Sequence, residues 1–124
     1  MQLRMIRTNL LNLPEIKMPP GYRLRTYQEN DNWHWANIIN SSFGGDRTDA
    51  DTREQIVDRP EFESTGLFFS TYRDQPVGTA CAWKWNGADE KEVGQLHMVG
   101  VMPEHSGYRL GKWVSLAVLH YHRQ

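Results

Sequence analysis

The segment from Val99 to Lys112 combines residues whose types and spacing suit the binding of a phosphate group. An apolar run ends at Pro103, a turn follows around Gly107, and an apolar helix is predicted to begin near Arg109. The first N–H groups of a helix lack intrahelical acceptors, and the helix dipole favours negative charge beside them. The spacing therefore predicts a site for a phosphorylated ligand, with the preceding strand offering backbone to its tail. The alternative interpretation of Ser106 to Gly111 is a capped helix start without a ligand.

The elements that must position this turn are mostly strands. Two helices are predicted early in the chain: one capped by Asn30 or Asp31, and a shorter one capped by Thr48 with Asp51 closing a capping box. A last helix from about 109 to 122 is apolar nearly all round, so we expect cover on more than one of its sides. Period-two or apolar runs predict strands over residues 22–27, 67–72, 76–85 and 92–101, with turns at 73–75 and 86–91.

The chain is expected to hold one domain behind a short arm. Residues 1–20 form the arm: residues 2–10 alternate loosely enough for an outer strand, and the prolines from Pro14 to Pro20 predict a stiff linker. Residues 21–124 form the domain, which is large enough for a core of its own.

Composition excludes several classes of protein. Of the 124 residues, 39% are hydrophobic and 23% charged, as in ordinary globular proteins. The net charge of −1 gives no basic field, so nucleic acid is not expected as a partner. Cys81 is the one cysteine, which excludes an intrachain disulfide and suits a reducing compartment. No apolar run has the length of a membrane span and no signal peptide is recognisable, so we expect a cytoplasmic protein without membrane partners.

The order of strand, two helices, three strands, glycine turn and helix resembles the GNAT superfamily of acyl-CoA-dependent N-acyltransferases. The family signature reads Arg/Gln-x-x-Gly-x-Gly/Ala and follows Val-x-Pro. Here Val101-Met102-Pro103 matches the lead-in and Ser106 to Gly111 occupies the signature. The opening phrase Pro20 to Arg25 is also common in bacterial members. The resemblance implies an α/β (α+β) domain with a mixed, mostly antiparallel sheet and flanking helices.

Two positions depart from the signature. Ser106 stands where the family prefers Arg or Gln, and Arg109 stands where it prefers glycine, whereas Gly107 and Gly111 fit. Arg109 brings a positive charge close to a phosphate, an effect that glycine cannot provide. An arginine does not adopt a positive φ angle cheaply, and its side chain can obstruct a close backbone approach.

The resemblance implies acetyl-CoA as co-substrate and no metal. Its pantetheine would lie along Val99 to Val101, and its pyrophosphate would meet the N–H groups between Gly107 and Lys112. The expected acyl-CoA-binding residues are Val99, Gly100, Val101, Ser106, Gly107, Tyr108, Arg109, Leu110, Gly111 and Lys112.

Acetyl transfer to an amine needs a base, and the expected catalytic positions are Gln95 and His97. Strand alternation predicts that both lie on one face with Val99 and Val101. In related enzymes the positions of Gln95 and His97 often carry Glu or His. Gln95 cannot accept a proton, whereas a histidine, with a reference pKa of about 6.5, can. The alternative for His97 is a partly buried strand histidine bonded to its neighbours.

The resemblance covers about three quarters of a family domain, because the family continues with a further strand, a fourth helix and a terminal hairpin. Its fourth helix often carries a tyrosine that protonates the leaving thiolate, and we expect none after Gln124. Three explanations stay open: a piece of a longer acetyltransferase, a short form that dimerises through the exposed strand edge, or a non-catalytic relic. The expected function is transfer of an acetyl group from acetyl-CoA to a primary amine, on a small molecule or a peptide. The alternative is a non-catalytic acyl-CoA-binding or protein-interaction module.

Overall fold

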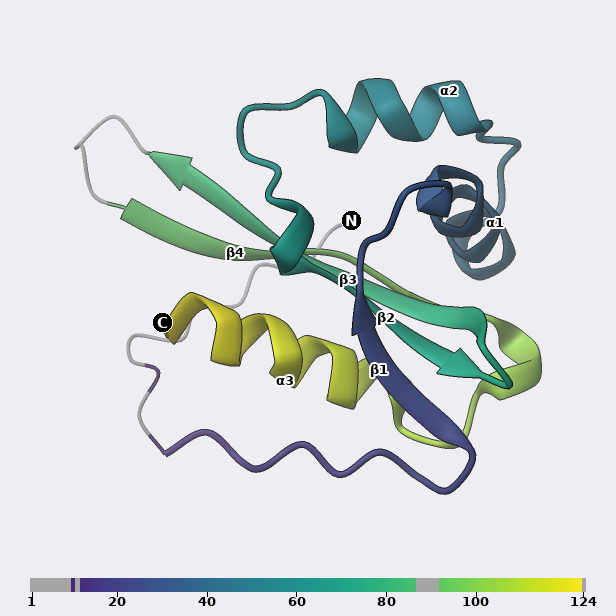
Figure 1. Ribbon diagram of the computed structural model, residues 1–124, viewed down its shortest axis with the longest axis vertical. Coiled ribbons are helices and arrows are strands. Elements are labelled where there is room, and N and C mark those ends of the chain that lie inside the picture. The colour runs from purple at the N-terminus through teal and green to yellow at the C-terminus, as the bar shows by residue number, and fades with distance from the viewer. Residues whose placement is uncertain (1–9, 11, 87–91, 124) are drawn as a thin grey trace.

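The fold is that of a computed structural model, which describes residue 10, residues 12–86 and residues 92–123. One sheet and a set of helical segments alternate along the chain (Figure 1). The strands are β1 (Tyr22–Thr26), β2 (Leu67–Tyr72), β3 (Gln75–Asn86) and β4 (Glu92–Val101). The α-helices are α1 (Asp31–Phe43), α2 (Asp49–Thr52) and α3 (Leu110–Arg123); a π-helical turn η1 (Arg53–Val57) and the 3₁₀ turns η2 (Ser64–Gly66) and η3 (Pro103–His105) complete the list.

The sheet has the strand order β1-β2-β3-β4, and all three neighbouring pairs are antiparallel. A tight turn suffices to connect the antiparallel neighbours β2 and β3, whereas the connection from β1 to β2 contains α1, α2, η1 and η2. Between β2 and β3 the turn is two residues long, and both Arg73 and Asp74 have positive φ, at 51° and 67°. The α/β class, the strands and their flanking helices were predicted from the sequence and are confirmed.

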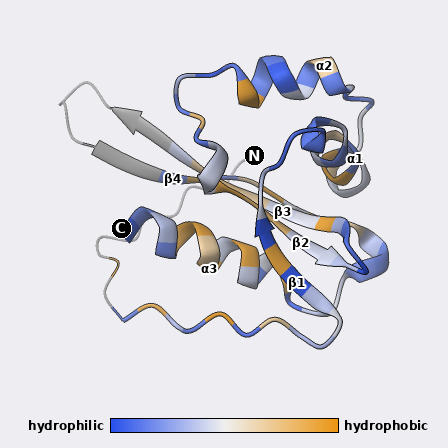
Figure 2. Ribbon diagram, in the orientation of Figure 1, coloured by the Kyte–Doolittle hydropathy of each residue, from blue (hydrophilic) through white to orange (hydrophobic). Residues whose placement is uncertain are grey.

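Helices cover both faces of the sheet, and the two faces hold separate parts of the core. On one face, α1 buries Trp35, Ile38 and Ile39 against Phe69 and Cys81. On the other face, α3 packs against β3 through the second cluster, which contains Ala80, Ala82, Val114 and Val118. Figure 2 shows hydrophobic and hydrophilic residues alternating along α3, as expected for a helix that buries a defined face.

The residues that precede α1 and α2 cap these helices in different ways. Thr48 and Asp51 form the predicted capping box: the Asp51 N–H donates to Thr48 Oγ1, and the Thr48 N–H donates to the Asp51 carboxylate. Asn30, by contrast, precedes α1 with φ at 78° and makes no side-chain cap, so that prediction is wrong for Asn30. The neighbouring Asp31 is the first residue of α1. Its carboxylate accepts from both terminal nitrogens of Arg25, at 2.7 and 2.9 Å, and from the Gln28 N–H.

The arm that precedes β1 runs along α3 (Figure 1). His120 Nε2 forms a 2.8 Å hydrogen bond with the Pro14 carbonyl, and Met18 packs against the cluster that contains Leu110. The arm therefore supplies the second cover that the apolar composition of α3 predicts. The predicted outer strand over residues 2–10 falls almost entirely outside the described residues, and the division at residue 20 stays a prediction.

β4 is an edge strand of the sheet that the described residues form. Its outer row of backbone groups faces away from β3, as in any edge strand. Dimerisation through this edge stays a prediction. None of the helices in the described residues combines the length and the apolar character needed to cross a membrane.

Candidate functional site

The turn between β4 and α3 has the backbone that the sequence predicts. Strand β4 ends at Val101, and η3 begins with Pro103. Ser106 closes η3, because its N–H and its hydroxyl both donate to the Pro103 carbonyl, at 3.1 and 2.9 Å. The chain then turns through Gly107, whose φ is 92°, and Arg109, whose φ is 60°, into α3. Holding a non-glycine residue in this left-handed region costs about 1–2 kcal/mol.

The backbone N–H groups of this turn are available as donors within the described part of the chain. Among the described residues, no N–H from Gly107 to Lys112 donates to a backbone carbonyl. The Trp113 N–H donates to the Arg109 carbonyl at 3.2 Å, so Arg109 immediately precedes the first helical turn. A guanidinium has no hydrogen-bond acceptor, so the Arg109 side chain cannot cap the helix. A ligand with acceptor oxygens can therefore take the donors that a Ser or Asp cap would have used.

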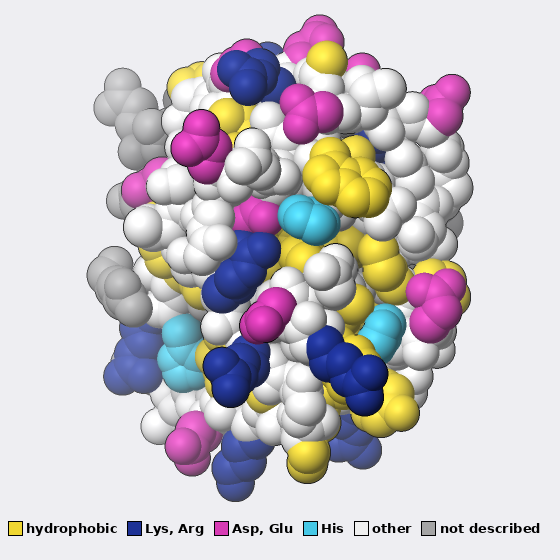
Figure 3. All heavy atoms as spheres, turned by 45° about the vertical axis from the view of Figure 1, so that its right-hand side comes forward, with side chains coloured by type: hydrophobic (Ala, Val, Ile, Leu, Met, Phe, Trp, Pro, Cys, Tyr) yellow, Lys and Arg dark blue, Asp and Glu magenta, His cyan; other side chains and the backbone are white. Residues whose placement is uncertain are grey.

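Positive side chains add to the helix dipole at this end of the sheet. Arg109 and Lys112 are exposed, and the Lys112 ammonium lies 4.9 Å from the centre of the Trp113 ring. Figure 3, which brings this side of the molecule forward, shows Lys and Arg side chains across the lower half of the face and more acidic ones in the upper half. Both the backbone and the side chains of the turn thus favour an anion.

A bulge in β4 changes which face its side chains occupy. Thr79 pairs with Gly100 and Cys81 pairs with His97, so two steps on β3 match three on β4. Met98 lies in the extra step and has φ at 51°. An inserted residue of this kind reverses the alternation of the strand beyond it.

The predicted common face of Gln95, His97, Val99 and Val101 is therefore wrong. His97 lies opposite Cys81, on the α1 face of the sheet, whereas Val99 packs with the cluster on the α3 face. Val101 packs on the same side as Val99, against the cluster that contains Leu110. The sheet thus separates the candidate base from the side chains expected to follow the pantetheine.

Gly100 faces α1 across a narrow gap. A Cβ atom placed on Gly100 would lie 3.1 Å from Ser42 Oγ and 3.2 Å from Ile39 Cδ1. The Ser42 hydroxyl also donates to the Val101 carbonyl at 2.7 Å. The absence of a side chain at Gly100 therefore serves the approach of α1 to the end of β4.

His97 is the predicted site residue with the most distinctive surroundings. Its ring lies 4.5 Å from the Trp83 ring, centre to centre, at an interplanar angle of 32°. Burial lowers the pKa of His97 below its usual 6.5, and the nearby Glu61 carboxylate partly opposes that shift. His97 is therefore neutral at pH 7 and able to accept a proton. Gln95 is exposed; its backbone carbonyl bonds to His122 Nε2 at 3.1 Å, and its side chain has no proton-accepting role.

Sequence reasoning missed two side chains near these positions. One carboxylate oxygen of Glu61 is buried without a hydrogen-bond partner among the described residues. His105 is half-buried in η3, and its Nδ1 lies 2.8 Å from the Tyr22 hydroxyl in a hydrogen bond. This bond ties the turn to β1. No local sequence pattern indicates this bond, because Tyr22 and His105 lie 83 positions apart.

No group of three or more metal-ligating side chains comes together in the described part of the chain. His120 and His122 point to different partners, the Pro14 and Gln95 carbonyls, as their spacing on a helix predicts. The candidate site is thus built from backbone donors, two cations and a neutral histidine.

Curated relatives resemble nearly the whole chain. A mycothiol acetyltransferase from Mycobacterium sp. (strain MCS) is 31% identical over 126 residues, which cover 97% of this chain and 41% of that protein. A mycothiol acetyltransferase from Streptomyces griseus subsp. griseus is 30% identical over 128 residues, covering 97% and 40%. The chain therefore spans about two fifths of the length of these relatives.

Solved structures share the fold. A putative acetyltransferase from Pyrococcus horikoshii superposes with a TM-score of 0.70 at 17% identity, covering 89% of this chain and 37% of that one. An aminoglycoside N-acetyltransferase in complex with CoA superposes with a TM-score of 0.61 at 19% identity, covering 82% and 68%. The family model of the Acetyltransferase (GNAT) family matches residues 32–124, from the start of α1 through α3. The similarity to this family is thus not limited to the turn but covers most of the domain. The chain belongs to the GNAT acetyltransferase family.

Proposed function

We propose that the chain transfers an acetyl group from acetyl-CoA to a primary amine on a small molecule. The observation that carries this proposal is the start of α3 after the glycine turn. There, among the described residues, the N–H groups from Gly107 to Lys112 donate to no backbone carbonyl. The diphosphate of acetyl-CoA supplies acceptor oxygens and the negative charge that a helix N-terminus favours. Relatives named for mycothiol and for aminoglycosides support a small-molecule acceptor.

The pantetheine runs from this turn along β4, next to Val99 and Val101, and places the thioester near the bulge at Met98. The amine reaches the thioester from the α1 face, where His97 and Trp83 lie. Because β4 is an edge strand of the described sheet, the thioester lies at its outer edge, where the amine and His97 reach it from the α1 face while Val99 and Val101 contact the pantetheine from the α3 face.

The amine nitrogen attacks the thioester carbonyl carbon directly. A C–N bond forms, the C–S bond breaks, and the CoA thiolate leaves. His97 takes the proton that the nitrogen loses, and solvent returns a proton to the thiolate. A route through an acyl-cysteine has no suitable nucleophile, because Cys81 is fully buried and burial raises its pKa to about 12.

Calorimetric titration with CoA and with pantetheine tests the diphosphate site. If the turn holds the diphosphate, CoA binds at least about tenfold more tightly than pantetheine, since one charge-assisted hydrogen bond already contributes about 1.5–3 kcal/mol. Equal affinity for the two compounds would contradict the proposal.

Release of free thiol from acetyl-CoA over a panel of primary amines then tests the reaction. Amine-dependent release supports acetyl transfer. Binding of CoA without release on any amine favours the alternative, a non-catalytic acyl-CoA-binding module. No binding at all favours a protein-interaction module.

A further inference from the structure

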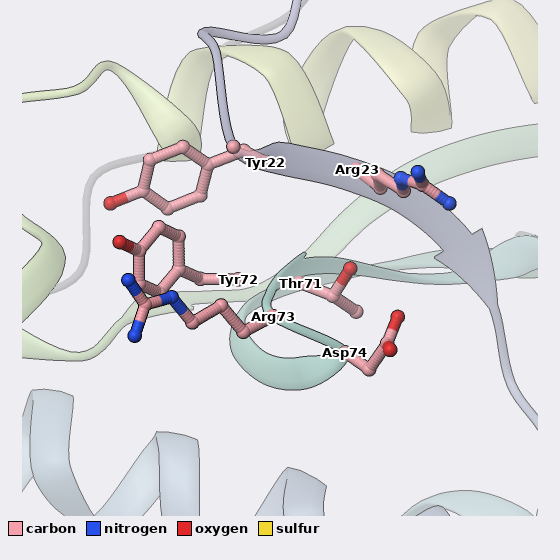
Figure 4. Close-up of a pocket in the computed structure, with 7 residues that line it drawn as sticks. Tyr22, Arg23, Thr71, Tyr72, Arg73 and Asp74 are labelled. Atoms are coloured by element: carbon pink, nitrogen blue, oxygen red, sulfur yellow. The ribbon is translucent and has the colours of Figure 1, made fainter.

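An open cavity of about 530 Å³ lies at the edge of the sheet away from β4. Residues 21–23 at the start of β1 and residues 71–74 at the tip of the β2–β3 hairpin line it (Figure 4). Its volume falls in the range of small-molecule sites. The turn that is proposed to hold CoA contributes no residue to this lining.

The hairpin tip has an unusual sequence for its conformation. Two-residue turns with positive φ at both central positions are normally occupied by Asn-Gly or Asp-Gly, because few side chains tolerate the left-handed region. Here Arg73 and Asp74 occupy those positions, and no glycine relieves the strain. Strained backbone that persists at the rim of a cavity points to a role for the side chains that it presents.

The polar groups of the cavity are available to a ligand. Arg23 and Thr71 are paired across β1 and β2, so their side chains share a face. Thr71 lines the cavity although only 4% of its surface is exposed. Figure 4 shows the Thr71 hydroxyl on the same side of the hairpin as the Arg23 guanidinium and the Asp74 carboxylate. Arg23 and Asp74 form no ion pair with each other.

The opposite side of the cavity is aromatic. The rings of Tyr22 and Tyr72 lie 5.0 Å apart, and the Arg73 guanidinium lies 5.3 Å from the centre of the Tyr72 ring. This contact orients the guanidinium through a cation–π interaction. No ion pair involves Arg73 within the described residues, so its N–H groups are also available.

We propose that this cavity binds a small anionic molecule that carries hydroxyl groups, such as a sugar phosphate or a hydroxy acid. Arg23 provides the fork of N–H donors that matches a phosphate or carboxylate, and Arg73, over the Tyr72 ring on the other side, adds positive charge. The Thr71 hydroxyl donates to the same anionic group. The Asp74 carboxylate accepts from a neighbouring hydroxyl of the ligand, which explains why an acidic residue stands in an otherwise cationic site.

Titration of the isotope-labelled chain with glycerol 3-phosphate, glycerate and glycerol, followed residue by residue in ¹⁵N–¹H NMR spectra, tests this proposal. We expect saturable shifts of the amides of Arg23, Thr71 and Asp74 with one or both anions, and none with glycerol. Comparing the two anions tells a phosphate site from a carboxylate site. Shifts confined to the amides from Gly107 to Lys112 would overturn the proposal, because they would report the diphosphate turn alone.

Two variants with the same charge change distinguish binding in the cavity from nonspecific electrostatic attraction of an anion to the protein. Arg23→Gln is expected to weaken anion binding at least about tenfold. Arg59→Gln makes the same charge change at an exposed position that lies outside the cavity lining, and it should leave the affinity unchanged. The spectra themselves report whether each variant is folded. Equal affinity of the Arg23 and Arg59 variants would refute the site, whereas failure of CoA to bind would leave it intact.

Discussion

Replacing Gly100 by alanine tests how closely α1 approaches β4. The added methyl group would lie 3.1 Å from Ser42 Oγ, 3.2 Å from Ile39 Cδ1 and 3.5 Å from Ile38 Cγ2. The first two of these distances are shorter than ordinary van der Waals contacts of a Cβ atom, which begin at 3.4 Å. Overpacking of a core costs about 1–3 kcal/mol. With a urea m-value of about 1–3 kcal/mol/M, the unfolding midpoint should fall by roughly 1 M.

A second substitution identifies the cause of that loss. Ile39→Val removes the Cδ1 atom that the new methyl group would meet. Alone it should cost about 0.5–1.5 kcal/mol, but combined with Gly100→Ala it should cost less than the sum by at least about 0.5 kcal/mol. Urea denaturation followed by tryptophan fluorescence measures all four proteins.

Gly111→Ala provides a control of opposite sign. Its Cβ would meet Val101 Cγ2 at 3.8 Å and Val99 Cγ1 at 3.9 Å, which are ordinary contacts, and the position is helical. This variant should gain about 0.5–1 kcal/mol because alanine favours a helix over glycine. An unchanged urea midpoint in Gly100→Ala, or no rescue by Ile39→Val, would refute the reasoning.

Three further predictions concern the site and the caps. His97→Gln should lower amine-dependent thiol release about 10²–10⁴-fold with unchanged CoA affinity; because burial lowers the pKa of His97, wild-type activity should stay level at pH 7 and decline only below about 6.5. An undiminished rate would remove His97 from the mechanism. Asp31→Asn removes one charge of the ion pair with Arg25, so the free energy of unfolding measured by urea titration should fall by roughly 1–3 kcal/mol. An unchanged free energy of unfolding would show that the pair is only a surface contact. Arg109→Gly relieves the positive φ and should raise the melting temperature, equivalent to about 1 kcal/mol, whereas a lower melting temperature would show that the arginine stabilises the turn.

Local patterns were enough to predict most of the elements. The hairpin of β2 and β3, the Thr48–Asp51 capping box and the turn from Pro103 to Gly107 all depend on residues close together in the chain. Backbone stereochemistry and hydrogen bonding act at that range, so sequence spacing reports them directly.

The faces of β4 could not be predicted in the same way. The apolar residues around Met98 continue the strand pattern without a glycine or proline at the extra position, so strict alternation was the natural expectation. A bulge depends on register with β3, which is set by packing on both faces of the sheet. The expectation therefore failed for the relation between His97 and Val99, although each residue lies in the predicted strand.

Contacts between distant segments escaped prediction for the same reason. The hydrogen bond between Tyr22 and His105 joins residues 83 positions apart. Asn30 was a plausible cap by type, but the Asp31 carboxylate, held by Arg25 and the Gln28 N–H, fixes the chain before α1 without it. In both cases tertiary partners outweigh the local preference.

The reversal of side-chain direction at Met98 has a consequence for how specificity can diverge. In the proposed function, positions before it, such as His97, face the amine, and positions after it, such as Val99, face the acyl donor. If the proposal holds, substitutions that change the acceptor fall on the α1 face of the sheet, and those that change binding of the acyl donor fall on the α3 face. The single extra residue at Met98 would then allow binding of the acceptor and binding of the acyl donor to be changed by separate substitutions.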